Sequence, residues 1–111
     1  MPLIHLNTIP FTEIAKGYLS KLVHSEHMTF SFVQVKAGES LPEHQHLHEQ
    51  VSIILEGRFR LCLDGIDTDF GKDEMVIIPS GMKHSGFAIT DCRILDVFNP
   101  VREDYRQRSS L

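Results

Sequence analysis

Short apolar segments separated by turn residues run along almost the whole chain, and this pattern restricts the fold more than any other feature of the sequence. Alternating or continuous apolar residues predict strands over residues 28–37, 51–55, 58–63, 66–70, 75–78, 84–90 and 93–98. No segment longer than about ten residues has the period of an amphipathic helix. Strands that recur about every 8–12 residues are typical of a sandwich or a barrel, so we predict an all-β fold.

The turns and the two ends of the chain are less regular. Asp64 and Gly65 predict a two-residue hairpin turn, because both positions can adopt a positive φ angle. Residues 9–16 are expected to form one helical turn, with Pro10 near its start and Gly17 directly after it. The polar tail over residues 103–111 is expected to be loose at its end.

Size and charge narrow the classes of function. The chain has 111 residues, of which 41% are apolar, so we expect a single domain over residues 1–111. A net charge of −4 argues against nucleic acid or an anionic membrane as a partner, because both attract clustered Lys and Arg. The apolar runs are too short to cross a bilayer. Without a recognisable signal peptide, and with only Cys62 and Cys92, we expect a cytoplasmic protein.

Histidine is unusually frequent, and three of the seven histidines, His44, His46 and His48, lie within five residues. On a strand, His44 and His46 point to the same face. A turn over residues 47–49 would bring Gln50 back beside them, and His84 follows a second tight turn. Neutral imidazoles suit Zn, Cu, Fe and Ni, whereas an amide oxygen is a harder donor. The cluster therefore indicates a metal site, although exposed histidines without a metal are the simpler alternative.

Two motifs in this region resemble the two conserved motifs of the cupins. The first runs from Gly38 to Gly57 and contains His44, His46 and Gln50, with Gln50 at the position where the family usually has Glu. The second runs from Asp73 to Ala88 and contains Pro79, Gly81 and His84; Asp73 and Ala88 replace the usual Gly and Asn. The resemblance covers about residues 32–98. It implies a single-domain jelly-roll β-barrel of two antiparallel sheets, with further strands within residues 1–27.

The same resemblance implies a ligand set for one divalent transition metal, which would be Ni, Zn, Fe, Cu or Mn. The four implied ligands are His44, His46, Gln50 and His84. Replacing Glu by Gln removes one negative charge and makes the site less selective for Mn-like ions. We expect His48 to be an exposed turn residue rather than a spare ligand.

The other titratable residues outside the two motifs are expected to play no part in the site. We expect His5, His24 and His27 to lie on the surface. Cys62 is expected to be a small buried apolar residue. Whether Cys62 approaches Cys92 is left open by the sequence.

The last predicted strand carries a second group of candidate residues. Asp96 and Phe98 share one face of this strand, and Arg102 follows Pro100, which ends the strand. If this face is turned inward, Asp96 is a carboxylate in an enclosed pocket, and Arg102 can reach over the barrel mouth to bind a carboxylate. If it is turned outward, Asp96 pairs with a surface lysine and Arg102 is an ordinary exposed residue. Strand alternation alone does not decide between these two arrangements.

The segment from Asp96 to Tyr105 is similar to the tail of the KdgF-type cupins of pectin breakdown, which linearise unsaturated uronates. This resemblance implies that Asp96, Phe98 and Arg102 form the active site beside the metal, and that the substrate is a small carboxylated sugar. Asp96 would then transfer the proton, Arg102 would bind the sugar carboxylate, and Phe98 would pack against the ring.

Two other functions are compatible with the same residues. A metal-dependent dioxygenase of a small organic acid would use the same ligands, and a binding module without catalysis would use the same pocket. By analogy with other cupins we also expect a homodimer, formed through an exposed sheet edge at residues 3–6 or 19–24.

Overall fold

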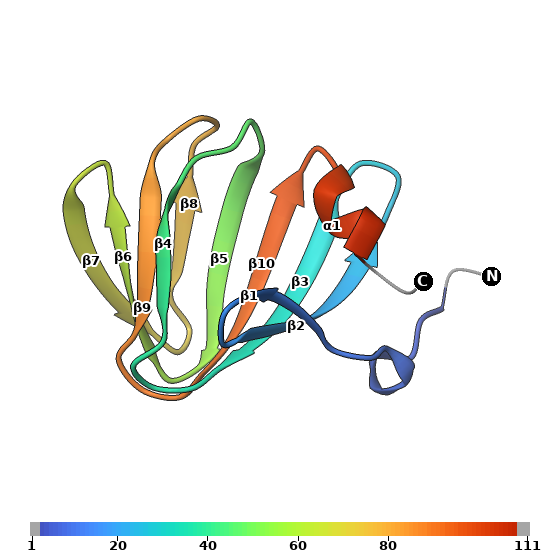
Figure 1. Cartoon of the computed structure of the whole chain (residues 1–111), viewed down its shortest axis with the longest axis horizontal. Helices are drawn as coiled ribbons and strands as arrows, with labels where there is room; N and C mark the ends of the chain where they lie inside the picture. Colours follow the sequence, from blue (N-terminus) through green and yellow to red (C-terminus); the bar gives the residue numbers. More distant parts are fainter. Residues whose placement is uncertain (1–2, 109–111) are drawn as a thin grey trace.

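Ten strands account for most of the chain in the computed structural model, which describes residues 3–108 (Figure 1). In chain order they are β1 (Thr12–Ala15), β2 (Tyr18–His24), β3 (Thr29–Val35), β4 (Ser40–His44), β5 (Glu49–Glu56), β6 (Arg58–Leu63), β7 (Ile66–Gly71), β8 (Met75–Ile78), β9 (His84–Ala88) and β10 (Cys92–Asn99). A short 3-10 helix (Leu6–Thr8) precedes β1, and α1 (Glu103–Arg108) follows β10.

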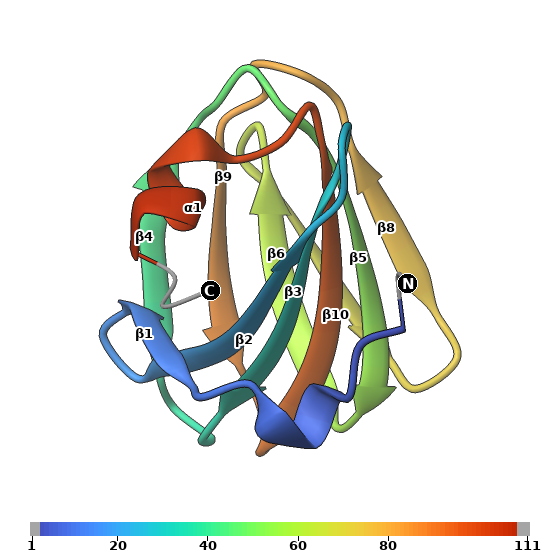
Figure 2. The same cartoon turned by 90° about the vertical axis from the view of Figure 1, so that its right-hand side faces the viewer.

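The strands form two antiparallel sheets that face each other as a jelly-roll barrel (Figures 1 and 2). One sheet has six strands in the order β1-β2-β3-β10-β5-β8, and the other has four in the order β4-β9-β6-β7. The predicted all-β, two-sheet architecture is therefore confirmed. The loop between β4 and β5, the loop between β8 and β9, and the connection from β10 to α1 all lie at one end of the barrel (Figure 2).

Apolar side chains from both sheets fill the barrel interior. Ile54 and Ile78 come from the six-stranded sheet, and Phe59 and Phe70 come from the four-stranded sheet. The Phe59 and Phe70 rings meet edge to face, with centroids 6.4 Å apart. Burying each such side chain contributes about 1.5–3 kcal/mol, so this interior supplies the main stabilisation of the barrel.

The predicted hairpin turn joins β6 to β7 as expected. Asp64 has φ +47° and Gly65 has φ +85°, which are the left-handed angles that a two-residue hairpin needs. The paired register then continues from Leu63–Ile66 to Arg58–Gly71.

Two expectations for the ends of the chain were wrong. Residues 12–15 form strand β1 and not a helical turn, because they pair with β2 from Thr12–Ser20 onwards. Residues 103–108 form helix α1 and not a loose tail; acidic residues lie in its first turn and arginines in its last, an arrangement that the helix dipole favours. Residues 109–111 of that tail lie outside the described part of the chain.

The edge strands also differ from the expectation. Residues 3–5 are not in a strand, and β2, which contains residues 19–24, lies between β1 and β3. The two edges of the six-stranded sheet are therefore β1 and β8. Pro42, which cannot donate a backbone hydrogen bond, lies in β4 at the edge of the other sheet. Within residues 3–108, no helix is long and apolar enough to cross a membrane.

Candidate metal centre

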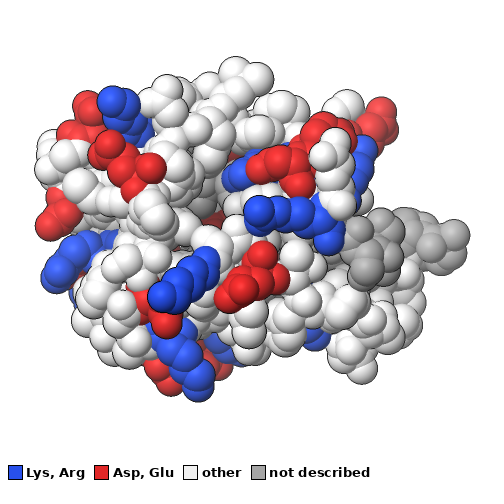
Figure 3. Space-filling model, in the orientation of Figure 1, with Lys and Arg blue, Asp and Glu red and all other residues white. Residues whose placement is uncertain are grey.

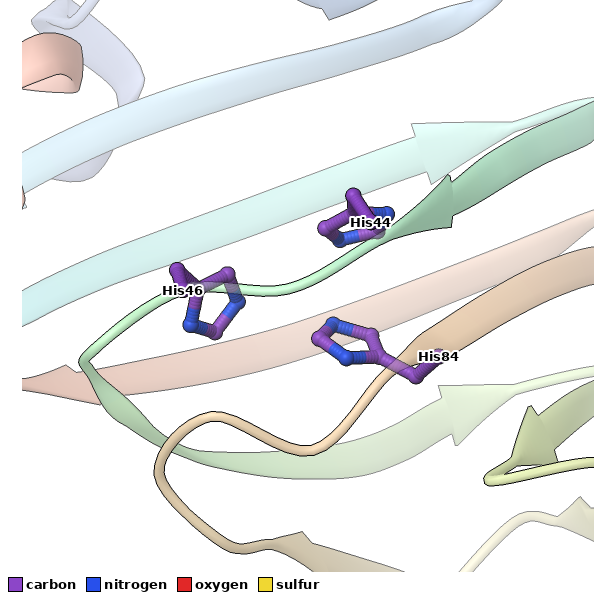
Figure 4. A group of neighbouring side chains, drawn as sticks. All are labelled: His44, His46 and His84. Atoms are coloured by element: carbon purple, nitrogen blue, oxygen red, sulfur yellow. The ribbon is translucent and has the colours of Figure 1, made fainter.

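Three histidines meet at the end of the barrel where the loops gather (Figure 4). His44 ends β4 and His84 begins β9, and the two residues are paired in the register of these strands. His46 lies in the loop that follows β4. One ring nitrogen from each histidine lies within 4.8 Å of the other two, so the structure brings together three of the predicted ligands.

Hydrogen bonds to the backbone decide which nitrogen of each ring is free. The Nδ1 atoms of His44, His46 and His84 lie 2.7, 3.0 and 2.9 Å from the carbonyl oxygens of Pro42, His48 and Met82. A carbonyl oxygen only accepts, so each Nδ1 donates a hydrogen. In a neutral ring the Nε2 atom then carries a free lone pair, and this is the arrangement that metal-binding histidines have in other proteins.

Burial favours the neutral form of two of these rings, His46 and His84. His84 is almost completely buried, and burial lowers its pKa to about 4. The pKa of His46 is also lowered, first by burial and next by the charge of Arg102. The Nε2 atom of His84 is buried and has no hydrogen-bond partner among the described residues. A buried acceptor without a partner is costly, and a bound cation would satisfy it.

Gln50 supplies the fourth candidate donor. It lies near the start of β5 with its side chain turned inward, and its Oε1 atom is 3.2 Å from Nε2 of His46. Because the His46 Nε2 atom carries a lone pair, two acceptors face each other, and a cation between them would turn repulsion into binding. Three imidazoles and one amide oxygen suit Ni, Zn, Fe or Cu, so the residues fit a divalent transition metal.

The two loops that carry the ligands are bonded to each other. The backbone N–H of Gly81 donates to the carbonyl oxygen of His46 over 2.8 Å. The hydroxyl of Ser80 donates to the carbonyl oxygen of Leu47 over 2.5 Å. The positions of His46 and His84 are thus fixed relative to each other by the protein itself.

Asp96 is turned into the barrel, which decides between the two orientations left open by the sequence. It lies on β10 between the buried residues Ile94 and Phe98, and it lines an interior pocket with Gln50, Ser52 and His84. Ser52 donates a hydrogen bond of 2.5 Å to its carboxylate. Burial raises the pKa of Asp96 to about 6, against the opposing effects of its hydrogen bonds and of the charge of Arg102.

Arg102 lies beside this pocket and is held from three sides. Its Nε and Nη2 atoms donate to the Asp104 carboxylate over 3.0 and 2.6 Å. Its guanidinium lies 3.7 Å from the centroid of the Tyr105 ring and 4.8 Å from that of the Phe98 ring. Asp104 thus occupies one edge of the guanidinium, and the Nη1 side is the part left to bind another anion. Figure 3 shows a hollow in one face of the molecule, with acidic and basic side chains interspersed around it.

Two histidines outside the ligand set differ from the expectation. His48 is half-buried and not exposed: its ring lies 5.5 Å from that of His46, and its carbonyl oxygen accepts the His46 hydrogen bond. His24 is also half-buried, with Nδ1 2.9 Å from the hydroxyl oxygen of Thr29. His5 and His27 are exposed, as expected.

The sequence reasoning missed Ser52, Asp104 and Tyr105. Ser52 is two residues after Gln50, so strand alternation would have placed it on the same inward face. Asp104 and Tyr105 lie in the segment that resembles the KdgF-type tail, but the sequence alone does not indicate their contact with Arg102. Cys62 is half-buried, Cys92 is buried, and both are free thiols.

Comparisons with known proteins agree with this architecture. The profile of the cupin domain family matches residues 31–98. The structure of KdgF from Halomonas sp. superimposes with a TM-score of 0.87 at 21% identity, covering 95% of this chain and 98% of that one. An RmlC-like cupin from Shewanella frigidimarina gives 0.87 at 22% identity, with coverages of 95% and 96%. A mutant of Bacillus subtilis oxalate decarboxylase OxdC gives 0.78 at 21% identity, covering 87% of this chain and 29% of that longer one. No curated protein matches the sequence.

Proposed function

This chain belongs to the cupin family, and we propose from that premise that it linearises ketonised unsaturated uronates, the sugar acids released when pectin or alginate is cleaved. The observation that carries the proposal is the inward position of Asp96, a carboxylate with a pKa raised to about 6, beside a set of metal ligands. The resemblance of the segment from Asp96 to Tyr105 to the KdgF-type cupins supports the same substrate class.

The chemistry of ring opening matches what these residues can do. When a cyclic hemiketal opens, the bond between the hemiketal carbon and the ring oxygen breaks, and one proton moves from the hydroxyl group to the ring oxygen. Nothing is added or lost, so no oxidant or co-substrate is needed. A carboxylate whose pKa is close to neutral can both accept and release that proton, and Asp96 has this property.

The neighbours of Asp96 would position the sugar. Arg102 would bind the sugar carboxylate through the N–H groups that Asp104 leaves free. The buried Phe98 ring would pack against one face of the sugar and keep water away from Asp96. The four ligand residues would hold a divalent metal, which supplies Lewis-acid polarisation of a substrate oxygen when it is bound.

The test uses purified, metal-loaded protein and the products of a pectate or alginate lyase, with ring opening followed by NMR. We expect Asp96→Asn to lower kcat by about 10²–10⁴-fold, because the proton acceptor is lost. Arg102→Lys keeps the charge but loses the planar fork, so it should mainly raise KM. Asp69→Asn is the control, since Asp69 pairs with Arg60 on the outer part of β6 and β7.

Two results would overturn the proposal. Ring opening no faster than in buffer would rule out this substrate class. An unchanged rate in Asp96→Asn would rule out proton transfer by Asp96. Oxygen consumption by the iron-loaded protein with a small organic acid would favour the dioxygenase alternative. We keep the cytoplasm as the proposed location, where a reducing environment maintains free thiols such as Cys62 and Cys92.

A further inference from the structure

A chain of hydrogen bonds links a metal ligand to the proposed proton-transfer residue. The side-chain amide nitrogen of Gln50 donates to the hydroxyl oxygen of Ser52 over 3.0 Å. The Ser52 hydroxyl in turn donates to Oδ1 of Asp96 over 2.5 Å. Gln50 and Ser52 are two residues apart on β5, and Asp96 is directly opposite Ser52 in the register of β5 and β10. Both Gln50 and Ser52 are buried, so water does not replace these bonds.

The direction of each of these hydrogen bonds can be worked out in turn, starting from the Asp96 carboxylate. An ionised carboxylate only accepts, so Ser52 uses its single hydrogen for Asp96. The Ser52 oxygen is then left as an acceptor, and only the NH₂ end of the Gln50 amide can donate to it. With its NH₂ end bound to Ser52, the amide turns its oxygen towards Nε2 of His46. A reversed amide would place two N–H hydrogens where the metal binds.

We propose that Ser52 is a positioning residue that transmits the charge of Asp96 to Gln50, and so fixes the Gln50 oxygen, rather than its NH₂ group, towards the metal. This inference rests on the proposed metal centre and not on the uronate substrate. This role is specific to a cupin with glutamine at this position. A glutamate has two equivalent oxygens and needs no such orientation, whereas a glutamine ligand binds through only one of its two ends.

Partners that orient metal ligands are worth about 10–100-fold in metal affinity. We therefore expect Ser52→Ala to weaken Zn²⁺ binding by about 10-fold or more, measured by competition with a chromophoric chelator. Ser52→Thr keeps the hydroxyl and should bind Zn²⁺ within about 3-fold of the unmodified protein. The visible spectrum of bound Co²⁺ should change in Ser52→Ala, because the oxygen ligand is no longer held in place. Neither measurement requires turnover, so an error in the proposed substrate leaves this test unaffected.

The decisive control is the same substitution in a Gln50→Glu background. A carboxylate offers an oxygen in either orientation, so adding Ser52→Ala there should change Zn²⁺ affinity by less than about 3-fold. Combining Ser52→Ala with Asp96→Asn should cost no more than either change alone, since both break the same chain. The inference is overturned if Ser52→Ala binds Zn²⁺ as the unmodified protein does, or if it loses as much affinity in the Gln50→Glu background.

Discussion

Burial shifts the pKa values of two candidate ligands, His46 and His84, and that of Asp96 in opposite directions. It lowers the pKa of His84 to about 4 and also lowers those of His46 and His24, so the folded protein resists protonating these rings. It raises the pKa of Asp96 to about 6, so the folded protein resists ionising this carboxyl. Acid therefore has two opposing effects on the free energy of unfolding.

The sign of each effect follows from which state binds more protons. Between about pH 6.5 and 4 the unfolded chain protonates His84 more readily than the folded protein does, so acid destabilises the fold. From pH 7.5 to 5 this lowers the free energy of unfolding by about 2 kcal/mol. Over the same range the folded protein protonates Asp96 more readily than the unfolded chain does, which raises the free energy of unfolding by about 1 kcal/mol. With three histidines against one carboxyl, we expect a net loss of stability between pH 7.5 and 5.

Urea unfolding in a buffer with a chelator, so that no ion competes with protons, measures this balance. Asp96→Asn removes the opposing carboxyl, so the loss between pH 7.5 and 5 should be larger in the variant than in the unmodified protein. The variant should also be the more stable of the two at pH 7.5. A smaller loss in Asp96→Asn would contradict the assigned pKa directions.

The candidate ligands could be located from the sequence, but the residues that contact and position them could not. His44, His46, Gln50 and His84 are fixed by spacing within two short segments, each shaped by its own turn. Ser52 acquires its role only because Asp96, 44 residues away, is opposite it on the neighbouring strand. A single sequence does not give the register between strands so far apart in the chain. From the sequence alone, Ser52 therefore cannot be distinguished from any other small residue on the inner face of its strand.

At the scale of elements, the turns and strands were easier to predict than the two ends of the chain. Alternation and the Asp64–Gly65 turn located most strands because both are local signals. Helix α1 was missed because it is short and is held by packing: Tyr105 meets the Phe98 ring at 5.7 Å and stacks on Arg102. Arg108 also donates a hydrogen bond to the distant carbonyl oxygen of Ile14. Such a helix is stabilised by packing and not by its own sequence.

The tight connection between β5 and β6 allows the effect of close packing at a turn to be separated from the effect of its backbone angle. Gly57 has φ +91°, and an added Cβ atom would collide with the carbonyl oxygen of Asp91. Gly65 has a similar φ of +85°, but nothing lies within 4 Å of the position of its missing Cβ. Gly57→Ala should therefore lower the free energy of unfolding by about 3 kcal/mol, against about 1 kcal/mol for Gly65→Ala. Urea denaturation measures both, and equal losses would show that the collision is relieved.

At the scale of the whole molecule, the outer face of the six-stranded sheet is unusually apolar. Two rows of side chains cross four neighbouring strands on this face, as the register shows: Phe32, Leu95, Ile53 and Met75 in one row, and Phe30, Val97, Val51 and Ile77 in the other. When one face of a sheet is in contact with water, the side chains on that face are normally polar and alternate along each strand with the apolar side chains of the buried face. A continuous apolar face of this kind is typical of a protein–protein interface.

We therefore retain the expected homodimer as a proposal and place its interface on this outer face. Light scattering after size exclusion should give about twice the chain mass of 12.7 kDa. Ile77→Lys, on β8, should shift the protein towards the monomer because it places a charge in the interface. Ile66→Lys is the matched control: Ile66 is 70% exposed, against 58% for Ile77, but lies on β7 in the other sheet. A monomer at every concentration would contradict the proposal.

The hydrogen bonds that join the loop after β4 to the loop before β9 run between groups of the protein itself. The bond from Ser80 to Leu47 ties together residues that are 33 positions apart in the sequence. The candidate ligands on the two loops therefore share one framework, and a change in either loop is expected to displace the histidines of both.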